Sequence, residues 1–394
     1  MYDIQNYFAA PEHRPLIQVD SDKTDWAWQS MSRFYPTATV LRDGAINALP
    51  TALDTSIGSI PFDHPELGRL TVDEHVADAT VDGLVVVRGG EVVYERYETM
   101  RPFDVHNWFS AGKSISGTLV ALLEAQGKVD VSQPVSSYVD ELLGSVWDTV
   151  TVEETLDMAT GLDCTEHDEV EDTARIDPDA GWYRWGVTLG LATDVRGRNE
   201  TTWDVFRSMQ RRRPGHTAFE YNSMNTFLLG QIVERVTGTT ENEAFGAMIW
   251  REIGAEGDGY IAISPSGYCC TFGFASSRLR DLARFGMIFT PSWRRLSDTP
   301  IVPEHVLSKI QAGGRPEIFD QGRVGTEMQQ SFPDVRLSNR YQWDIVFPDG
   351  DHFKAGVGGQ GLYVSASRDL VVAYFSTGKH REELLARTIA LANG

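Results

Sequence analysis

The sequence predicts an α+β protein in which both ends of the chain form one mixed sheet and a helical region lies between them. Residues 83–97 and 361–376 are rich in β-branched and aromatic side chains, which is typical of strands. Between them, apolar residues recur at helical spacing and long loops separate the helical runs. At 394 residues, the chain is long enough for two compact units.

These patterns predict three regions. An irregular N-terminal segment with Pro and Gly punctuation should pack on the core. A sheet domain should be discontinuous in sequence, and a mainly helical region should be inserted into it. The predicted boundaries are 1–75 for the N-terminal segment, 76–109 with 256–394 for the sheet domain, and 110–255 for the helical region.

The first elements of the sheet and of the helical region are predicted from local sequence patterns. "GLVVVRGGEVVYERY" (83–97) places Gly89-Gly90 between two strand-like runs, which predicts a hairpin. From Ser110 to Gln126 the apolar residues follow helical spacing, and Gly127 stands where a C-cap belongs.

Later elements follow from similar signals. Residues 152–160 and 223–237 should be helical, the second ending before Gly238. "GLYVSASRDLVVAYFS" (361–376) reads as two strands around a turn, and a short helix over 381–391 should close the chain.

Charge and composition restrict the partners. The formal net charge is −21, which argues against nucleic acid and anionic membranes, because neutralising phosphates requires a basic surface. The N-terminus has neither the basic start nor the apolar core of a signal peptide, so a cytoplasmic protein is expected. The three cysteines have no framework spacing, which favours buried reduced thiols.

Residues 161–180 are rich in acids, with Arg175 as their basic residue. They lack the ligand spacing of an EF-hand or a similar metal site, so a solvated acidic loop is the favoured interpretation.

The stretch "NWFSAGKSISG" (107–117) carries the chemistry. Gly112-Lys113-Ser114 could end a phosphate-binding loop, but the glycine that such a loop needs is Asn107, followed by bulky Trp108 and Phe109. The alternative is a Ser-x-x-Lys motif, which places Lys113 one helical turn after Ser110 and on the same face. A lysine made neutral by burial can take the proton of a serine hydroxyl, and the turn offers a backbone N–H to an oxyanion.

Alone, this motif is weak, because Ser376-Thr-Gly-Lys379 repeats it. That copy follows a strand and contains a glycine, so we interpret it as chance. Two further stretches support the first copy: "PGHTAFEYNSMN" (214–225), with Tyr221 just before a helix, and "HFKAGVGGQG" (352–361), with Lys354 in a short strand.

Together, Ser-x-x-Lys, Tyr-x-Ser and Lys-Ala-Gly resemble the motifs of the serine β-lactamase and penicillin-recognising family. Within that family the chain is most similar to the 6-aminohexanoate-dimer (nylon-oligomer) hydrolases and to family VIII-type carboxylesterases. The resemblance implies a β-lactamase/transpeptidase-like fold, in which a mostly antiparallel sheet is flanked by helices and a helical region is inserted. It places the site in the cleft between the sheet and the helical region.

The resemblance also implies roles. Ser110 would be the nucleophile, Lys113 its base and Tyr221 a proton shuttle, while the backbone N–H groups of Ser110 and Val357 would form the oxyanion hole. Asp177 would bind a substrate amine, and Trp182 would close over the substrate.

The chain departs from the family pattern at two motifs. Ser223 stands where an amide side chain is usual, with Asn225 two residues further on, and this weakens a β-lactam interpretation. Lys354 could hold a substrate carboxylate or be a solvated strand lysine. For Asp177 taken by itself, a surface position is favoured over a substrate contact, whereas Trp182 could equally be a core residue.

The sequence therefore predicts a serine hydrolase that cleaves a small-molecule ester or amide through an acyl-enzyme, with no metal or cofactor. A β-lactamase or D-Ala-D-Ala peptidase is the alternative enzyme, although the absence of a signal peptide counts against it. A non-catalytic binding or scaffold protein of the same fold is a second alternative. The oligomeric state stays open, with a homodimer as one alternative.

Overall fold

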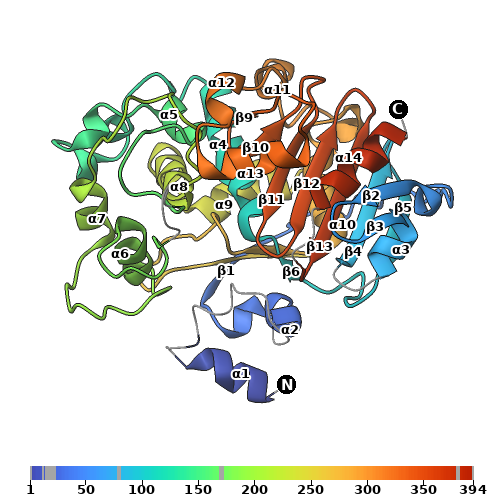
Figure 1. Ribbon diagram of the computed structural model, residues 1–394, viewed down its shortest axis with the longest axis horizontal. Helices are drawn as coiled ribbons and strands as arrows, with labels where there is room; N and C mark the ends of the chain where they lie inside the picture. Colours follow the sequence, from blue (N-terminus) through green and yellow to red (C-terminus); the bar gives the residue numbers. More distant parts are fainter. Residues whose placement is uncertain are drawn as a thin grey trace.

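The computed structural model describes residues 2–10, 13, 24–77, 81–167, 173–378 and 382–392. Within them, seven strands form one antiparallel sheet in the order β5-β4-β13-β12-β11-β10-β9 (Figure 1). These strands are β4 Val81–Arg88, β5 Glu91–Tyr97, β9 Ser338–Arg340, β10 Trp343–Val346, β11 His352–Gly356, β12 Gln360–Ser365 and β13 Leu370–Ser376. Both ends of the chain contribute to this sheet, so the predicted fold class is confirmed.

The hairpin between β4 and β5 is the one that the sequence predicts. Gly89 and Gly90 both have positive φ angles, 59° and 78°, which side chains other than glycine rarely adopt. At the other end of the chain, β12 and β13 pair around the predicted turn. The closing helix is α14 Glu382–Ala392.

Both faces of the seven-stranded sheet are buried. Alternate side chains of β4 enter different apolar clusters, Val85 and Val87 on one face and Leu84 and Val86 on the other. α10 (Leu279–Met287) packs on the first face, whereas α14 and α3 (Val72–Ala77) pack on the second.

The helical region packs around α4 (Lys113–Ala125) and α8 (Ser223–Thr237). α8 has the predicted bounds, with Gly238 in a left-handed C-cap. α5 (Val152–Leu156) is shorter than predicted, and Met158 just beyond it has a positive φ angle of 49°. The other helices are α1 Tyr2–Ala9, α2 Thr24–Trp28, α6 Gly181–Thr188, α7 Thr202–Ser208, α9 Glu241–Phe245, α11 Glu304–Gln311, α12 Pro316–Phe319 and α13 Arg323–Ser331.

A second sheet joins the N-terminal segment to the strands at 259–262 and 275–277 and to the short strand just before Ser110. Its order is β1-β7-β8-β6, and its strands are β1 Thr37–Val40, β7 Gly259–Ala262, β8 Ala275–Ser277 and β6 His106–Asn107. β6 leads directly into the Ser-x-x-Lys stretch, so this sheet fixes where that stretch begins. A separate hairpin pairs β2 Pro61–His64 with β3 Gly68–Thr71.

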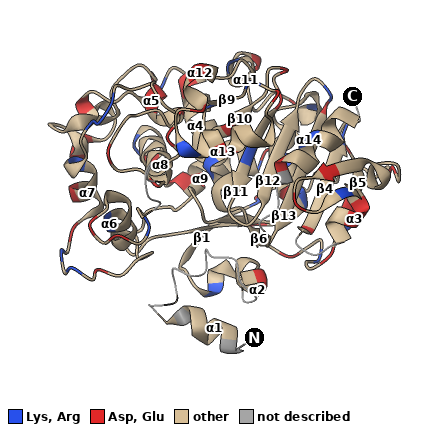
Figure 2. Ribbon diagram, viewed as in Figure 1, with Lys and Arg blue, Asp and Glu red and all other residues tan. Residues whose placement is uncertain are grey.

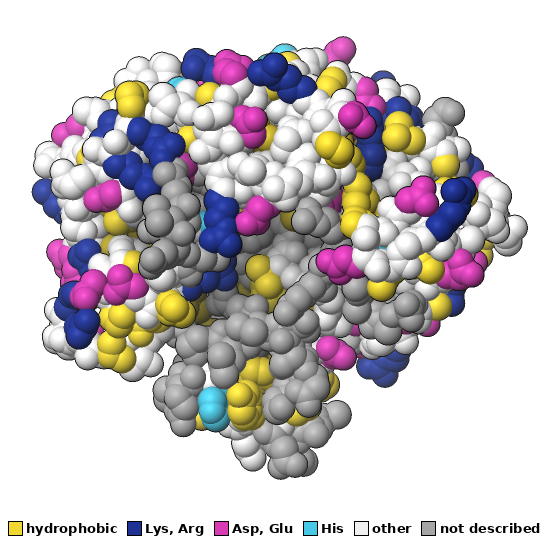
Figure 3. Space-filling model, viewed as in Figure 1, with side chains coloured by type: hydrophobic (Ala, Val, Ile, Leu, Met, Phe, Trp, Pro, Cys, Tyr) yellow, Lys and Arg dark blue, Asp and Glu magenta, His cyan; other side chains and the backbone are white. Residues whose placement is uncertain are grey.

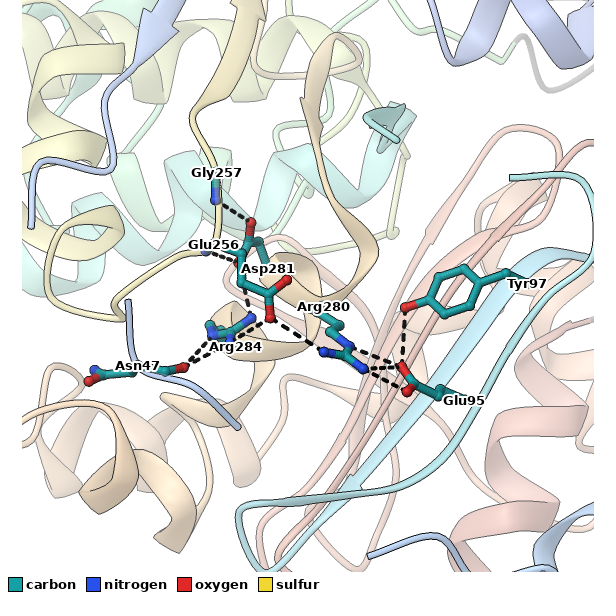
Figure 4. A network of polar contacts seen from close by, with 8 residues as sticks. All are labelled: Asn47, Glu95, Tyr97, Glu256, Gly257, Arg280, Asp281 and Arg284. Atoms are coloured by element: carbon teal, nitrogen blue, oxygen red, sulfur yellow. Dashed lines mark hydrogen bonds and ion pairs between the residues drawn. The ribbon is translucent and has the colours of Figure 1, made fainter. Parts of the chain in front are cut away.

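A polar network attaches α10 to its surroundings (Figure 4). The buried Arg284 side chain donates to Asp281 at 3.1 Å, to Glu256 at 2.8 Å and to the carbonyl of Asn47. Asp281 also accepts the backbone N–H of Glu256 at 2.7 Å. Each buried charge therefore has a partner, which is the condition under which buried charges are tolerated.

Charged residues of both signs are spread over the surface loops (Figure 2). Basic residues, drawn in blue, also lie at β11 and α13 in the middle of the view. Among the described helices, none combines the length and the apolar character that crossing a bilayer would need. Residues 168–172 of the predicted acidic loop and Lys379 of the second Ser-x-x-Lys copy lie outside the described residues.

Candidate active site

Ser110 lies in a 3₁₀ turn, Phe109–Gly112, between β6 and α4. The α-helix thus begins at Lys113, three residues later than the predicted start. Phe109 is buried and has a φ angle of 47°, a left-handed conformation that is unusual for an aromatic residue. Such strain persists only when the surroundings impose it. Here the Trp108 N–H donates to the Ala275 carbonyl at 2.7 Å, which holds the chain just before the turn.

Lys113 reaches Ser110 directly. Its Nζ lies 2.9 Å from Ser110 Oγ and 2.5 Å from the carbonyl oxygen of Phe272. The side chain is fully buried, and none of the described carboxylates forms an ion pair with it. Burial lowers the pKa of Lys113 to about 7, although the charge of Glu166 opposes this shift. A large neutral fraction therefore exists near neutral pH, and neutral lysine can accept a proton from a hydroxyl.

Tyr221 lies just before α8, where Asn222 caps the helix by accepting the Met224 N–H at 3.0 Å. Its ring centroid is 5.1 Å from Lys113 Nζ and 4.8 Å from Lys354 Nζ. Burial raises the pKa of Tyr221 well above its usual value, and a hydrogen bond with Ser110 opposes this. Its phenol therefore stays neutral and can donate a proton at the site.

Lys354 is fully buried, which excludes the solvated alternative. It forms an ion pair with Asp344 on the neighbouring strand β10, and the other oxygen of Asp344 accepts the Ala355 N–H at 3.0 Å. Burial lowers the pKa of Lys354, and the carboxylate of Asp344 opposes this. Among the described residues, Asp344 rather than Lys354 lines the pocket.

The end of β11 closely approaches the nucleophile turn. A Cβ at Gly356 would lie 2.5 Å from the Trp108 carbonyl oxygen, so a side chain there would force the two segments apart. Val357 follows directly and lines the same pocket as Ser110. The structure thus brings together the two backbone segments that are predicted to form the oxyanion hole.

The pocket has a volume of about 340 Å³. Figure 3 shows this face hollowed at the centre of the view, with basic and acidic side chains at the edge of the hollow. The described lining residues are Ser110, Glu166, His167, Arg175, Tyr221, Val324, Glu327, Met328, Asp344, Ala355, Gly356 and Val357.

Four charged residues of this lining, Glu166, Arg175, Glu327 and Asp344, were not predicted as site residues. Glu166 is buried and accepts the backbone N–H of Ser223 at 2.8 Å, the Ser223 hydroxyl and a guanidinium N–H of Arg175. Burial would raise the pKa of Glu166, but Arg175 and Lys113 lower it to about 2. No motif links these residues in sequence, so only the acidic character of 161–180 gave any signal.

The remaining predicted residues are not among the described residues that line the Ser110 pocket. Ser223 and Asn225 are buried at the start of α8, and neither is among the described pocket-lining residues. Asp177 is exposed and lines a separate depression, where its carboxylate accepts the Asp179 N–H at 2.9 Å. Trp182 is 9% exposed and packs in the core beneath the Arg175 guanidinium.

A buried carboxyl lies behind the nucleophile helix. Glu241 accepts the hydroxyl of Ser116 on α4 at 2.5 Å and the hydroxyl of Thr271. Thr271 precedes Phe272, whose carbonyl holds Lys113. Burial raises the pKa of Glu241 to about 7, and the two hydroxyl donors oppose this shift. This contact ties α4 to the segment that positions the lysine.

The model of the β-lactamase family matches residues 70–393. A curated relative, the 6-aminohexanoate-dimer hydrolase of Paenarthrobacter ureafaciens, is 30% identical over 357 residues, or 89% of this chain and 85% of the relative. This chain belongs to the β-lactamase family. Both findings identify it as a serine hydrolase of the amidase and esterase type.

Solved structures show the same fold. A Bacillus anthracis protein whose provisional name is 6-aminohexanoate-dimer hydrolase has a TM-score of 0.77 at 20% identity, covering 95% of this chain and 94% of that one. EstCE1, a hydrolase with promiscuous acyltransferase activity, has a TM-score of 0.58 at 12% identity, covering 80% and 94%. A class C β-lactamase has a TM-score of 0.55 at 13% identity, covering 80% and 90%.

Proposed function

We propose that this β-lactamase-family chain hydrolyses a small ester or amide through an acyl-enzyme on Ser110. Neutral Lys113 takes the hydroxyl proton as Ser110 Oγ attacks the substrate carbonyl. The backbone N–H groups of Ser110 and Val357 stabilise the oxyanion. Tyr221, reprotonated through Lys113, passes the proton to the leaving alcohol or amine. Water then attacks the acyl-enzyme, and its proton passes through Lys113 and Tyr221 to Ser110 Oγ. This step releases the carboxylic acid and restores the serine hydroxyl.

One observation carries this proposal. Lys113 Nζ lies 2.9 Å from Ser110 Oγ in a fully buried position whose pKa is lowered to about 7. A charged lysine would only stabilise the serine oxygen electrostatically, whereas a neutral one can remove the proton. The same geometry argues against a scaffold protein, because a buried lysine with no carboxylate partner among the described residues is costly to maintain without a catalytic use.

Two contacts favour a linear ester or amide over a β-lactam or a D-Ala-D-Ala peptide. Ser223, at the position of the missing amide side chain, donates its hydroxyl to Glu166 rather than to the pocket. Lys354 is neutralised by Asp344 and is not among the described pocket-lining residues, so it is poorly placed to hold a substrate carboxylate. The curated relative is named for hydrolysis of a dimer of 6-aminohexanoate, which supports the same substrate type.

The proposal is tested by covalent labelling. A fluorophosphonate probe should label the wild type and Ser376→Ala but not Ser110→Ala, with the labelled peptide identified by mass spectrometry. Ser376→Ala is the matched control, because Ser376 begins the second Ser-x-x-Lys copy. Labelling at Ser376, or no labelling at all, would contradict the mechanism.

A substrate panel tests the class of reaction. Short-chain p-nitrophenyl esters and linear aminohexanoate amides should be hydrolysed with higher kcat/KM than nitrocefin. A preference for nitrocefin would instead support the β-lactamase alternative.

A further inference from the structure

The charged groups of the pocket are not equally available to a substrate. Glu166 is 3% exposed, and both of its oxygens already accept hydrogen bonds, one from Arg175 and the other from the backbone N–H and hydroxyl of Ser223. Asp344 is engaged by Lys354 and the Ala355 N–H. These two carboxylates therefore serve as internal partners rather than as substrate ligands.

Arg175 is the group that these contacts present to the pocket. One Nη donates to Glu166, and the guanidinium lies over the Trp182 ring, 5.1 Å from its centroid. Its side chain is 31% exposed and lines the same pocket as Ser110. A guanidinium has five N–H donors, and among the described residues Glu166 is the acceptor that it uses. Nε is buried and has no acceptor among the described residues, and Glu166 accepts from one Nη only. Within the part of the chain that the structure describes, the partly exposed guanidinium therefore has donors left for a ligand.

The fixation of Arg175 matters as much as its charge. A flexible arginine loses side-chain entropy when it binds a ligand, whereas one already held on two sides loses little. Glu166 fixes the guanidinium from one direction and Trp182 supports its face, so its orientation is preorganised. Arginine donates and never accepts, so its partner in a substrate must be an acceptor oxygen.

We propose that Arg175 is a substrate-specificity residue that binds an acceptor oxygen, in a carboxylate or an amide carbonyl, at a distance from the bond that is cleaved. The inference rests on the proposed function, since it assumes that substrates are cleaved at Ser110. It assigns as substrates esters and amides that carry a second acceptor group, in preference to purely alkyl ones. It also differs from the prediction for Asp177, which would favour a substrate amine.

The test uses two matched series of esters. One varies the far end of the acyl chain and the other varies the far end of the alcohol, each ending in carboxylate, carboxamide, methyl or amine. In at least one series the wild type should favour the carboxylate or carboxamide end over methyl by about ten- to a hundredfold in kcat/KM, mostly through KM. Arg175→Met should abolish this preference, while Arg175→Lys should keep part of it for the carboxylate alone.

The matched control is Arg184→Met. Arg184 makes a similar partly buried ion pair, with Glu200, and it is not among the described residues of the Ser110 pocket. This variant should leave the preference unchanged. Fluorophosphonate should still label Ser110 in Arg175→Met, which shows that the nucleophile and its base remain in place. Because Arg175 also acts on Glu166 and Lys113, the overall rate can change, so the readout is the preference among terminal groups within each series.

Several outcomes would overturn the inference. Equal kcat/KM for all four terminal groups in both series would show that Arg175 is not the specificity residue. A preference that survives in Arg175→Met would show the same. A wild-type preference for the amine end that disappears in Asp177→Asn assigns specificity to Asp177 instead. These results leave the proposed function intact if Ser110 is still labelled, whereas absent labelling overturns both.

Discussion

Lys113 and Lys354 are both fully buried, and each lies about 5 Å from the centroid of the Tyr221 ring, yet their surroundings differ. Lys354 contacts the carboxylate of Asp344, whereas Lys113 contacts a hydroxyl and a backbone carbonyl. Burial lowers the pKa of both lysines, but only Lys354 has a directly bound carboxylate to oppose it. Burial alone therefore does not prepare a lysine to act as a base, because a paired carboxylate keeps it charged. The buried lysine without such a partner is the one suited to accept a proton.

The largest expected effect comes from making Lys113 permanently charged. Lys113→Arg should lower kcat/KM on the order of 10⁴-fold, because arginine does not lose its proton in a protein. Steady-state kinetics with a p-nitrophenyl ester measure this loss, and circular dichroism checks that the variant is folded. Activity within about tenfold of the wild type would show that Lys113 acts only by its charge.

The next effect concerns the paired lysine and is on stability. Lys354→Met leaves the Asp344 carboxylate buried without its partner, so the free energy of unfolding should fall by about 3–5 kcal/mol. Urea denaturation measures this. The double variant Lys354→Met with Asp344→Asn should recover much of the loss, because no uncompensated charge remains. If the two single changes simply add, the two side chains are not energetically coupled.

A smaller and graded effect is expected from pH. The proposed mechanism requires neutral Lys113, so kcat/KM should fall about tenfold per pH unit below a pKa of about 7 and level off above it. The charge of Glu166 raises the pKa of Lys113, so Glu166→Gln should lower that pKa. The acidic limb of the profile, where kcat/KM falls, should then move to lower pH. Profiles from pH 5 to 9 for both proteins measure the shift. A limb that moves to higher pH would contradict this electrostatic account.

The smallest effect is expected behind α4. Glu241 has hydroxyl donors and no described cationic partner, so Glu241→Gln should change kcat/KM by less than about threefold. Glu241→Leu instead removes the acceptor for two buried hydroxyls and should cost about 1–3 kcal/mol of stability. Thermal unfolding together with kinetics separates the two variants. A large loss of activity in Glu241→Gln would show that the charge itself is needed.

The sequence predicted those parts of the molecule that depend on short-range spacing. The contact between Ser110 and Lys113 follows from an offset of three residues, and Gly238 marks the end of α8 in the sequence itself. The hairpin around Gly89-Gly90 and the strands of 361–376 are likewise local patterns. The fold class followed from where these elements lie along the chain.

The parts that could not be predicted depend on distant contacts. Arg175 and Glu327 reach the same pocket from segments about 150 residues apart, and no spacing rule joins them. The burial of Lys354 depends on both faces of the sheet being covered, which its own strand does not reveal. The prediction that Asp177 meets the substrate rested on resemblance, and it stays a prediction. The helix start was placed three residues early because a 3₁₀ turn and an α-helix share the same short apolar pattern.

The union of both chain ends in one sheet has a consequence for synthesis on the ribosome. β4 must wait for its partner β13, and Thr377 contacts Asp82 across 295 residues. Val357 is made about 250 residues after Ser110, a delay of about 12–50 s at about 5–20 residues per second. Throughout that delay a nascent chain holds the serine and the lysine without the strand end that completes their pocket. Esterase activity should therefore emerge only when synthesis is almost finished, and a stalled nascent chain should be catalytically silent.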